Sequence, residues 1–413
     1  MANSLIVASV ATGQNFTDAA TYFTSLSGLI RAGASEAQAE TPVRDGGTFS
    51  NLYVYVSANT ASVTSVITLR KSQADTAVTV SYTSDQTGVK EDTSNSVLFA
   101  NTDEVDYSIV VPSEAGTNNM NIRIMSVQFA PTTTTDCIMF FMTNGAKTVN
   151  SASTSYYLVP NGQINHSITE ADSKYRIRQS FTSSDFYAYA SANARTTDTV
   201  FSTRKSGGDG GQGFTYTSGQ TGVKEDNSGT DSLAAGDDFC FEIVTSTGTE
   251  TMTLNVISCS MISTANFFPL LTGDAAGSGI VFNSTDQFPS AGALLFTTTE
   301  LRAQTLPRFD FTATEFGTYA TANTIITTAT PIHVRDNGAN GNLTVSYDVL
   351  QTGLKNDSVN SDVFTSGSDE INYQIITPNT AGTITLTWLG VLGSTAVTPA
   401  TAKISKMMLM GVG

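Results

Sequence analysis

Residues that usually carry catalysis or cross-links are rare in this sequence. Its 413 residues include two histidines, three cysteines and one tryptophan. His166 and His333 stand far apart with no cluster of metal-ligating residues around them, so we interpret both as ordinary packed or exposed side chains. Cys137, Cys240 and Cys259 do not fit a repeated disulfide framework, and we predict that they are buried as small hydrophobic residues. The sequence shows no nucleophile, base or metal set of the kind that a hydrolase or transferase needs.

Charged residues make up only 14% of the chain, and acidic ones dominate, giving a formal net charge of -16. Such an excess repels nucleic acid and anionic membrane surfaces, so we expect neither as a partner. No stretch approaches the roughly 18 apolar residues of a membrane helix. The N-terminus, MANSLIVASVATGQNF, has no basic region and too short an apolar run for a secretory signal. We therefore expect a soluble protein that is made in the cytoplasm.

One heptapeptide recurs three times along the chain. It reads QTGVKED at Gln86–Asp92 and at Gln220–Asp226, and QTGLKND at Gln351–Asp357. The copies lie roughly 130 residues apart, and their flanking patterns recur with them, which indicates duplication of a whole domain. The sequence therefore predicts three tandem domains that arose by internal triplication.

The predicted domains cover residues 1–131, 132–264 and 265–413, and each opens with an apolar run that ends in glycine. A fourth apolar run, Lys406–Gly413, closes the chain. On one interpretation each opening strand completes the sheet of the preceding domain or bridges two neighbours, so that the last run is a closing strand for the third domain. On the other interpretation the last run is an ordinary C-terminal strand.

Alternating apolar residues and frequent turn signals indicate β-strands throughout. One strand places Leu52, Val54 and Val56 on one face. Near the end of each domain the alternation changes phase, between Ile124 and Met125 in the first copy, which predicts a β-bulge or bend in all three copies. About six to eight short strands per domain, without a helical period, predict an all-β fold of three antiparallel β-sandwiches of jelly-roll type.

The repeated heptapeptide is the main candidate for a contact site. Its Thr-Gly pair favours a turn, and its Lys beside Glu and Asp forms exposed ion pairs that stabilise little. A turn specification explains the motif, and so does a loop that contacts a neighbouring subunit in the same way three times. On the second interpretation the contact residues are Gln86, Lys90, Gln220, Lys224, Gln351 and Lys355.

Acidic residues also recur just before a later strand, as Asp103 and Glu104 in the first copy. With Asp92 they offer the oxygen ligands that Ca²⁺ prefers, if a turn brings the three together. Polar pairs are also an ordinary way to start a strand, and no EF-hand spacing is present. Both interpretations stay open, and we expect no other cofactor.

The features YVYVSAN, ITLRKS, SYTSDQTGVKEDTSNSV and VDYSIVV resemble the jelly-roll modules of virion structural proteins of tailed bacteriophages, particularly capsid decoration and fibre proteins. The similarity covers the later two thirds of each predicted domain. It implies a non-enzymatic head or tail component of the virion, assembled in the host cytoplasm, with the major capsid protein or neighbouring structural subunits as partners. The absence of a heptad or collagen repeat argues against a long fibre.

Arrangement and function each keep an alternative. Three fused copies form a pseudo-threefold unit in place of a homotrimer, or they run in a line across several subunits; self-association into a homo-oligomer is a further option. The alternative function is a receptor- or glycan-binding adhesin, whose exposed aromatic residues are then Tyr156 with Tyr157 or Phe267 with Phe268. An enzyme such as a glycosidase needs two acids across one cleft, whereas the recurrent acids here lie in separate copies.

Overall fold

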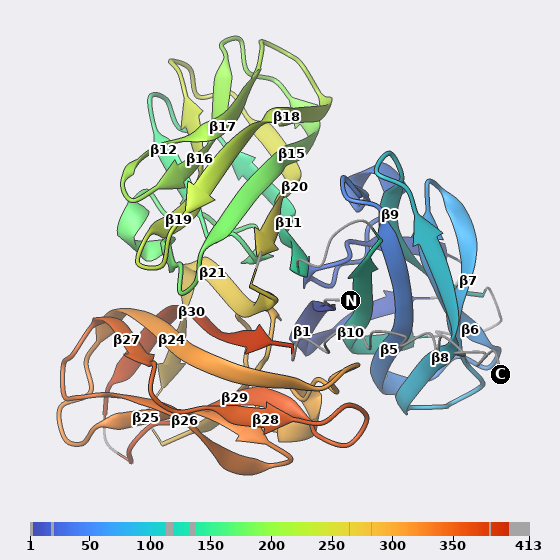
Figure 1. Cartoon of the computed structure of the whole chain (residues 1–413). Coiled ribbons are helices and arrows are strands. Elements are labelled where there is room, and N and C mark those ends of the chain that lie inside the picture. The colour runs from blue at the N-terminus through green and yellow to red at the C-terminus, as the bar shows by residue number, and fades with distance from the viewer. Residues whose placement is uncertain are drawn as a thin grey trace, which may run out of the picture.

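The computed structural model describes residues 3–17, 20–112, 119–132, 137–263, 265–281, 283–379 and 381–395. Over these residues the chain forms β-strands and three single-turn 3-10 helices, with no α-helix (Figure 1). Accordingly, no helix in the described part is long and apolar enough to cross a membrane.

The strands fall into three groups with the same order, which we call the first, second and third repeats. The first contains β1 (Ser4–Thr17), β2 (Ala20–Thr24), β3 (Gly28–Leu29), η1 (Glu36–Gln38), β4 (Thr41–Pro42), β5 (Gly47–Asn59), β6 (Ser65–Lys71), β7 (Ala74–Tyr82), β8 (Gly88–Phe99), β9 (Glu104–Val111) and β10 (Asn119–Pro131). The second contains β11 (Cys137–Val149), β12 (Ser155–Leu158), β13 (Gly162–Gln163), η2 (Glu170–Asp172), β14 (Tyr175–Arg176), β15 (Phe181–Asn193), β16 (Thr199–Lys205), β17 (Gly208–Tyr216), β18 (Gly222–Leu233), β19 (Asp238–Thr245) and β20 (Met252–Ser263). The third contains β21 (Phe267–Val281), β22 (Thr285–Pro289), β23 (Gly292–Ala293), η3 (Glu300–Arg302), β24 (Phe311–Asn323), β25 (Thr330–Asp336), β26 (Ala339–Tyr347), β27 (Gly353–Asp357), β28 (Asp362–Phe364), β29 (Ile371–Ile376) and β30 (Thr383–Ser394).

Each repeat is a sandwich of two antiparallel sheets. In the first repeat the inner sheet has the order β1-β10-β5-β8 and the outer sheet the order β2-β9-β6-β7. The inner sheets of the other repeats are β11-β20-β15-β18 and β21-β30-β24-β27, and their outer sheets are β12-β19-β16-β17 and β22-β29-β25-β26. The chain thus alternates between the two sheets in the order of a jelly roll. The predicted all-β, jelly-roll fold is confirmed.

In the first repeat, the central strands β5 and β10 of the inner sheet are buried on both faces, whereas the edge strand β8 is largely exposed. In β5, Leu52, Val54 and Val56 are fully buried in the sandwich, as their alternation predicts. The intervening Tyr53 and Tyr55 are also only 3% and 7% exposed. The inner sheets must therefore pack against other repeats as well as against their own outer sheets.

The predicted irregularity in the last strand of each repeat is confirmed. The pairing of β10 with β5 shifts register on either side of Ile122, so that Arg123 is skipped. The pairings of β20 with β15 and of β30 with β24 shift at the equivalent places. The bulge lies within one or two residues of the phase change in the sequence pattern, because the extra residue is what reverses the faces of those that follow.

The opening strands belong to the sheets of their own repeats. β1 pairs with β10, β11 with β20 and β21 with β30. The interpretation that each completes the preceding sheet is therefore wrong, because the last strand of the same repeat supplies its antiparallel partner. Bridging does occur at β21, which also pairs with β13 of the second repeat. The closing run Lys406–Gly413 lies outside the described residues.

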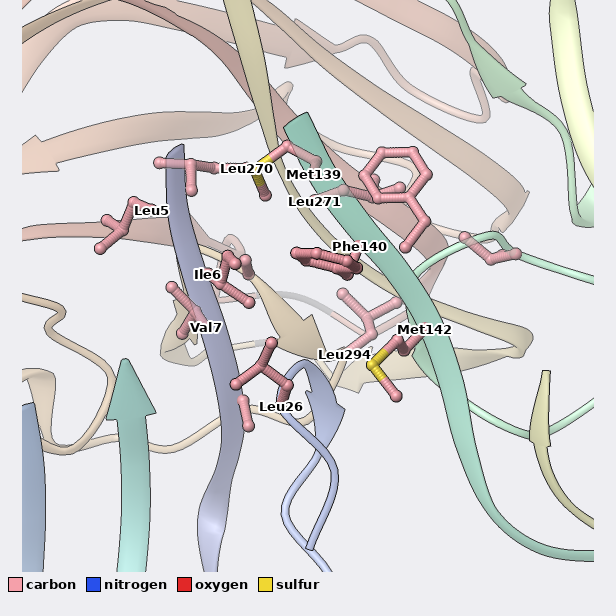
Figure 2. Packing of buried hydrophobic residues seen from close by; sticks show 14 of the residues in the cluster. Leu5, Ile6, Val7, Leu26, Met139, Phe140, Met142, Leu270, Leu271 and Leu294 are labelled. Atoms are coloured by element: carbon pink, nitrogen blue, oxygen red, sulfur yellow. The ribbon is translucent and has the colours of Figure 1, made fainter. Parts of the chain in front are cut away.

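The three repeats form a ring around β1, β11 and β21 (Figure 1). β3 packs against β11, β13 against β21, and β23 against β1, so the third repeat returns to the first. Apolar side chains of the opening strands, including Ile6, Phe140 and Leu270, gather in the middle (Figure 2). The arrangement is a pseudo-threefold ring and not a line.

One continuous hydrophobic cluster runs through all three repeats. The predicted domain boundaries at 131/132 and 264/265 fall between β10 and β11 and between β20 and β21. Because the cores are joined, the division into three domains that fold independently stays a prediction.

Candidate functional site

Three equivalent glycines surround the pseudo-threefold axis: Gly28, Gly162 and Gly292. Their φ angles are positive, at 81°, 140° and 105°. A Cβ atom on Gly162 would lie 2.0 Å from the carbonyl oxygen of Gly273, and one on Gly292 would lie 2.8 Å from that of Gly28. The backbones of neighbouring repeats approach so closely here that a side chain has no room.

Polar side chains join the repeats beside these glycines. Between the first and second repeats, the Asn144 amide donates to the Leu29 carbonyl at 2.9 Å and accepts from the Leu29 N–H at 2.7 Å. Between the second and third, Asn161 donates to a carbonyl of β21 at 2.7 Å. Between the third and first, Ser9 Oγ donates to the Ala291 carbonyl at 2.6 Å. Each seam thus satisfies backbone groups that packing removes from water.

A second layer of contacts comes from an equivalent arginine in each repeat. In the third–first seam, Arg308 Nη2 lies 3.1 Å from Glu91 Oε1, and the arginine side chain is 3% exposed. In the first–second seam, Arg44 forms the same ion pair with Glu225, and these side chains are 23% and 35% exposed. Both glutamates belong to the repeated heptapeptide, so the motif takes part in closing the ring.

The second–third seam is built differently, because the third heptapeptide has Asn356 in place of glutamate. Nε and Nη2 of the equivalent Arg178 have no hydrogen-bond partner among the described residues. Gly317 stands where the first two repeats have tyrosine, and Trp388 packs beside it. The Trp388 indole donates from Nε1 to the Lys174 carbonyl at 2.7 Å. An aromatic contact thus replaces the ion pair.

The three candidate glutamines of the heptapeptides stabilise their own turns. Gln86 Oε1 accepts a hydrogen bond from the Thr83 N–H at 3.1 Å. Gln220 and Gln351 accept the equivalent bonds from the residues three positions before them. These side chains therefore have local partners, and a contact with another subunit through them stays a prediction.

The three candidate lysines, Lys90, Lys224 and Lys355, are partly exposed. No described residue forms a hydrogen bond or ion pair with their side chains. The contacts between repeats come instead from the next residue in the motif, Glu91 or Glu225. A contact of the lysines with another subunit stays a prediction.

The structure gives the cation candidates separate partners. Burial alone would raise the pKa of Asp92, but hydrogen bonds from β7 and from Asn95 lower it below the usual value. Asp103 forms an ion pair with Lys71 at 3.0 Å, and Glu104 opens β9. Across the described ranges, no group of three His, Cys, Asp or Glu side chains could hold a metal ion.

A cluster of acidic side chains is buried in the first repeat. Asp106 and Glu40 are 1% and 4% exposed, and each has a carboxylate oxygen without a hydrogen-bond partner in the described structure. Burial, reinforced by nearby carboxylates such as Glu36, raises the pKa of Asp106 to about 9 and that of Glu40 to about 7. The residues equivalent to Asp106 are Cys240 and Asn372, so the cluster is particular to this repeat.

Most of the other residues that the sequence analysis singled out are buried and contribute to packing. The three cysteines are buried and form no disulfide, as predicted. The His166 ring packs 4.3 Å from that of Tyr156. Tyr156 and Phe268, proposed as exposed aromatic residues of an adhesin, are 3% and 0% exposed. The expected exposure of these two residues is therefore wrong, whereas their neighbours Tyr157 and Phe267 are partly exposed.

Sequence reasoning missed the axial glycines and the seam arginines. The glycines lie in the part of each repeat that differs most, yet they recur as SGLI, NGQI and AGAL, with an aliphatic residue two positions later. Arg44, Arg178 and Arg308 stand at one fixed distance before the Ala-Asn pair of their repeats. An alignment of the three copies on that pair would have found all three arginines.

No protein-family model and no curated protein matches the chain. Among solved structures, the chain is similar to a protein described under "The Triple Jelly Roll Fold and Turret Assembly in an Archaeal Virus". The two share 11% identity with a TM-score of 0.18, and the match covers 92% of this chain and 90% of that one. The structure of Sulfolobus Turreted Icosahedral Virus is similar at 10% identity and a TM-score of 0.18, over 86% and 81% of the two chains. A Paenibacillus xanthan lyase is similar at 15% identity and a TM-score of 0.19. That match covers 67% of this chain, which spans only 30% of the lyase. At such scores these similarities carry no argument about function.

Proposed function

We propose that the protein is a non-enzymatic virion structural protein of a tailed bacteriophage, a capsid decoration or minor head protein that binds other capsid subunits. The observation that carries the proposal is the closed ring, in which one chain presents three similar jelly rolls around one axis. A homotrimer has the same geometry but dissociates on dilution, whereas a fused chain does not. Internal triplication into units at 1–131, 132–264 and 265–413 is the simplest origin for such a chain.

The contacts between the repeats support this role. Glycine contacts at the axis, buried amide hydrogen bonds and ion pairs hold the repeats in fixed positions. A stiff ring keeps its three binding surfaces at a constant spacing, so three weak contacts with a shell add without a further ordering cost. Lys90, Lys224 and Lys355 occupy equivalent places on the three repeats and have no partner within the described chain. We assign them to the contact with shell subunits.

Co-sedimentation tests the proposal. The full chain is mixed with capsids from the phage that encodes it, prepared from particles that lack this protein. Binding is expected to saturate at a fixed number of copies per capsid. The triple variant K90A/K224A/K355A is expected to bind at least about tenfold more weakly than the single variant K90A, because linked contacts multiply. Failure of the wild-type chain to bind capsids, with binding to a glycan array instead, would identify an adhesin.

A further inference from the structure

One end of the third repeat carries an exposed apolar tip that the other repeats lack. The tip consists of Ile326, Val349 and Leu350, which are 63%, 40% and 57% exposed. In Figure 1 the arrowhead of β30 points to the middle of the molecule, so the tip, where β24 ends and β30 begins, lies at the outer end of this lobe. Val281, 53% exposed, lies at the same end of the sheet, two strands away.

The same turn is polar in the first and second repeats. In the third repeat the Leu350 N–H donates to the carbonyl of residue 325 at 3.0 Å, and the Asp85 and Gly219 N–H groups donate to the equivalent carbonyls at 3.2 and 3.0 Å. This bond fixes the equivalence of the three turns. The residues at the tip positions are Ser62, Ser84 and Asp85 in the first repeat and Thr196, Ser218 and Gly219 in the second, and all are exposed.

The exposed apolar tip brings backbone strain and a risk of aggregation to the unbound protein. Leu350 has a φ of 59°, a left-handed conformation that glycine and aspartate, the residues of the other repeats, adopt more readily. Non-glycine residues held in this conformation are strained, and such residues collect at functional sites. An exposed apolar cluster adds an aggregation risk. The equivalent turns of the first and second repeats form the same hydrogen bond with polar residues. The fold therefore does not require apolar residues at the tip.

The apolar area of the tip and the charge around it indicate whether its binding partner is a second copy of this chain or another protein. Three partly exposed aliphatic side chains offer on the order of 200 Å² of apolar surface. Two tips that meet face to face would bury roughly 400 Å², well below the roughly 1,000 Å² of a stable interface. On a shell subunit, the area buried by the tip adds to the proposed lysine contacts of the ring. Two copies would also bring net charges of -16 together, with exposed Asp348 beside each tip. A concave pocket buries the same three side chains more completely.

We propose that the tip is a docking knob that inserts into an apolar pocket with a basic rim on a different protein. This deepens the proposed function, on which it rests for the identity of that protein as another virion subunit. A ring with three similar surfaces can sit on a threefold site in three ways. Because a single repeat carries the knob, its pocket selects one of those orientations and sets one partner contact per chain.

The test replaces the tip by the residues of the second repeat, as I326T/V349S/L350G. The matched control S62T/D85G gives the first repeat those same residues. Binding to the protein-free capsids is measured for both, together with the melting temperature and the sedimentation of the free protein. The tip variant is expected to bind at least about tenfold more weakly, with a melting temperature that is unchanged or higher, and the control is expected to bind like the wild type.

The outcomes test the docking knob separately from the proposed role in the virion. If wild type and tip variant bind capsids equally, the knob is refuted while the virion role stands. If the wild type does not bind capsids, or the tip variant is unstable, a photo-cross-linker at position 326 in producing cells decides, with positions 62 and 196 as controls. A single adduct with another protein, formed at 326 alone and lost in the V349S/L350G background, supports the knob. No adduct, or an adduct with a second copy of this chain, overturns it.

Discussion

Arg308 Nη2 of the third repeat lies 3.1 Å from Glu91 Oε1 of the first, and the guanidinium group sits 5.2 Å from the centre of the Tyr53 ring. The arginine side chain is 3% exposed. A charge that has lost its water in this way needs its partners, because an unpaired buried charge is far more costly than a paired one. This contact closes the ring, since it joins the last repeat to the first.

Glu91→Gln removes the charge that Arg308 needs, and we expect it to lower the free energy of unfolding by about 1–3 kcal/mol. Glu225→Gln is the matched control in the more exposed seam, where we expect a loss under about 1 kcal/mol. Urea unfolding followed by fluorescence measures both. Equal losses in the two variants would show that burial of Arg308 does not set the strength of the contact.

Asn356→Glu supplies the missing acid opposite Arg178. We expect a gain of about 0.5–1 kcal/mol in the free energy of unfolding, because Nε and Nη2 of Arg178 have no hydrogen-bond partner in the described structure. Asn356→Gln has the length without the charge and is expected to give no gain. Thermal unfolding at low and high salt measures the effect, and a gain of the same size in both variants would contradict the ion pair.

Gly162→Ala places a methyl group where the Gly273 carbonyl oxygen would be 2.0 Å away. We expect a loss of more than about 3 kcal/mol, or failure to fold, because neighbouring backbones must separate. Gly222→Ala is the control, since its φ is also positive at 87° but nothing lies within 4 Å of the added atom. The control is expected to lose only about 1 kcal/mol from backbone strain. Comparable losses would mean that φ, and not the close approach at the axis, explains the glycine.

Asp106→Asn is expected to stabilise the protein at alkaline pH. The folded-state pKa of Asp106, about 9, lies above its unfolded value, so the neutral form contributes its full stability below pH 4 and this is lost as pH rises toward 9. Asparagine does not ionise, and the third repeat already has Asn372 at this place. We expect a gain of at least about 2 kcal/mol at pH 8 and almost none at pH 4. Unfolding curves at both pH values measure it, and a pH-independent difference would refute the raised pKa.

The fold was predictable because its evidence is local. Alternation in segments such as Leu52–Val56 reports which side of a strand faces a core, and the phase change near Ile124 reports the bulge directly. Three copies of the pattern made the prediction firm, since a chance alternation would not recur at the same place.

The seams were less predictable because they depend on docking over long distances. In the heptapeptide, Lys90 and Glu91 point to opposite faces of β8, and nothing local tells which face another repeat covers. The sequence drew attention to the lysine and the structure places the glutamate in the contact. Gly28, Gly162 and Gly292 were overlooked for the same reason, since their neighbours across the axis are more than a hundred residues away in the chain.

The seam between the third and first repeats has a consequence for synthesis on the ribosome. The partners of β1 in the last seam, including Ala291, are translated tens of seconds after β1 at ordinary elongation rates. Until then the apolar residues of β1 that face the axis have no cover from the third repeat. During this period chaperones can bind β1 of the nascent chain, or β1 can pair wrongly with another copy that is being made on the same messenger RNA.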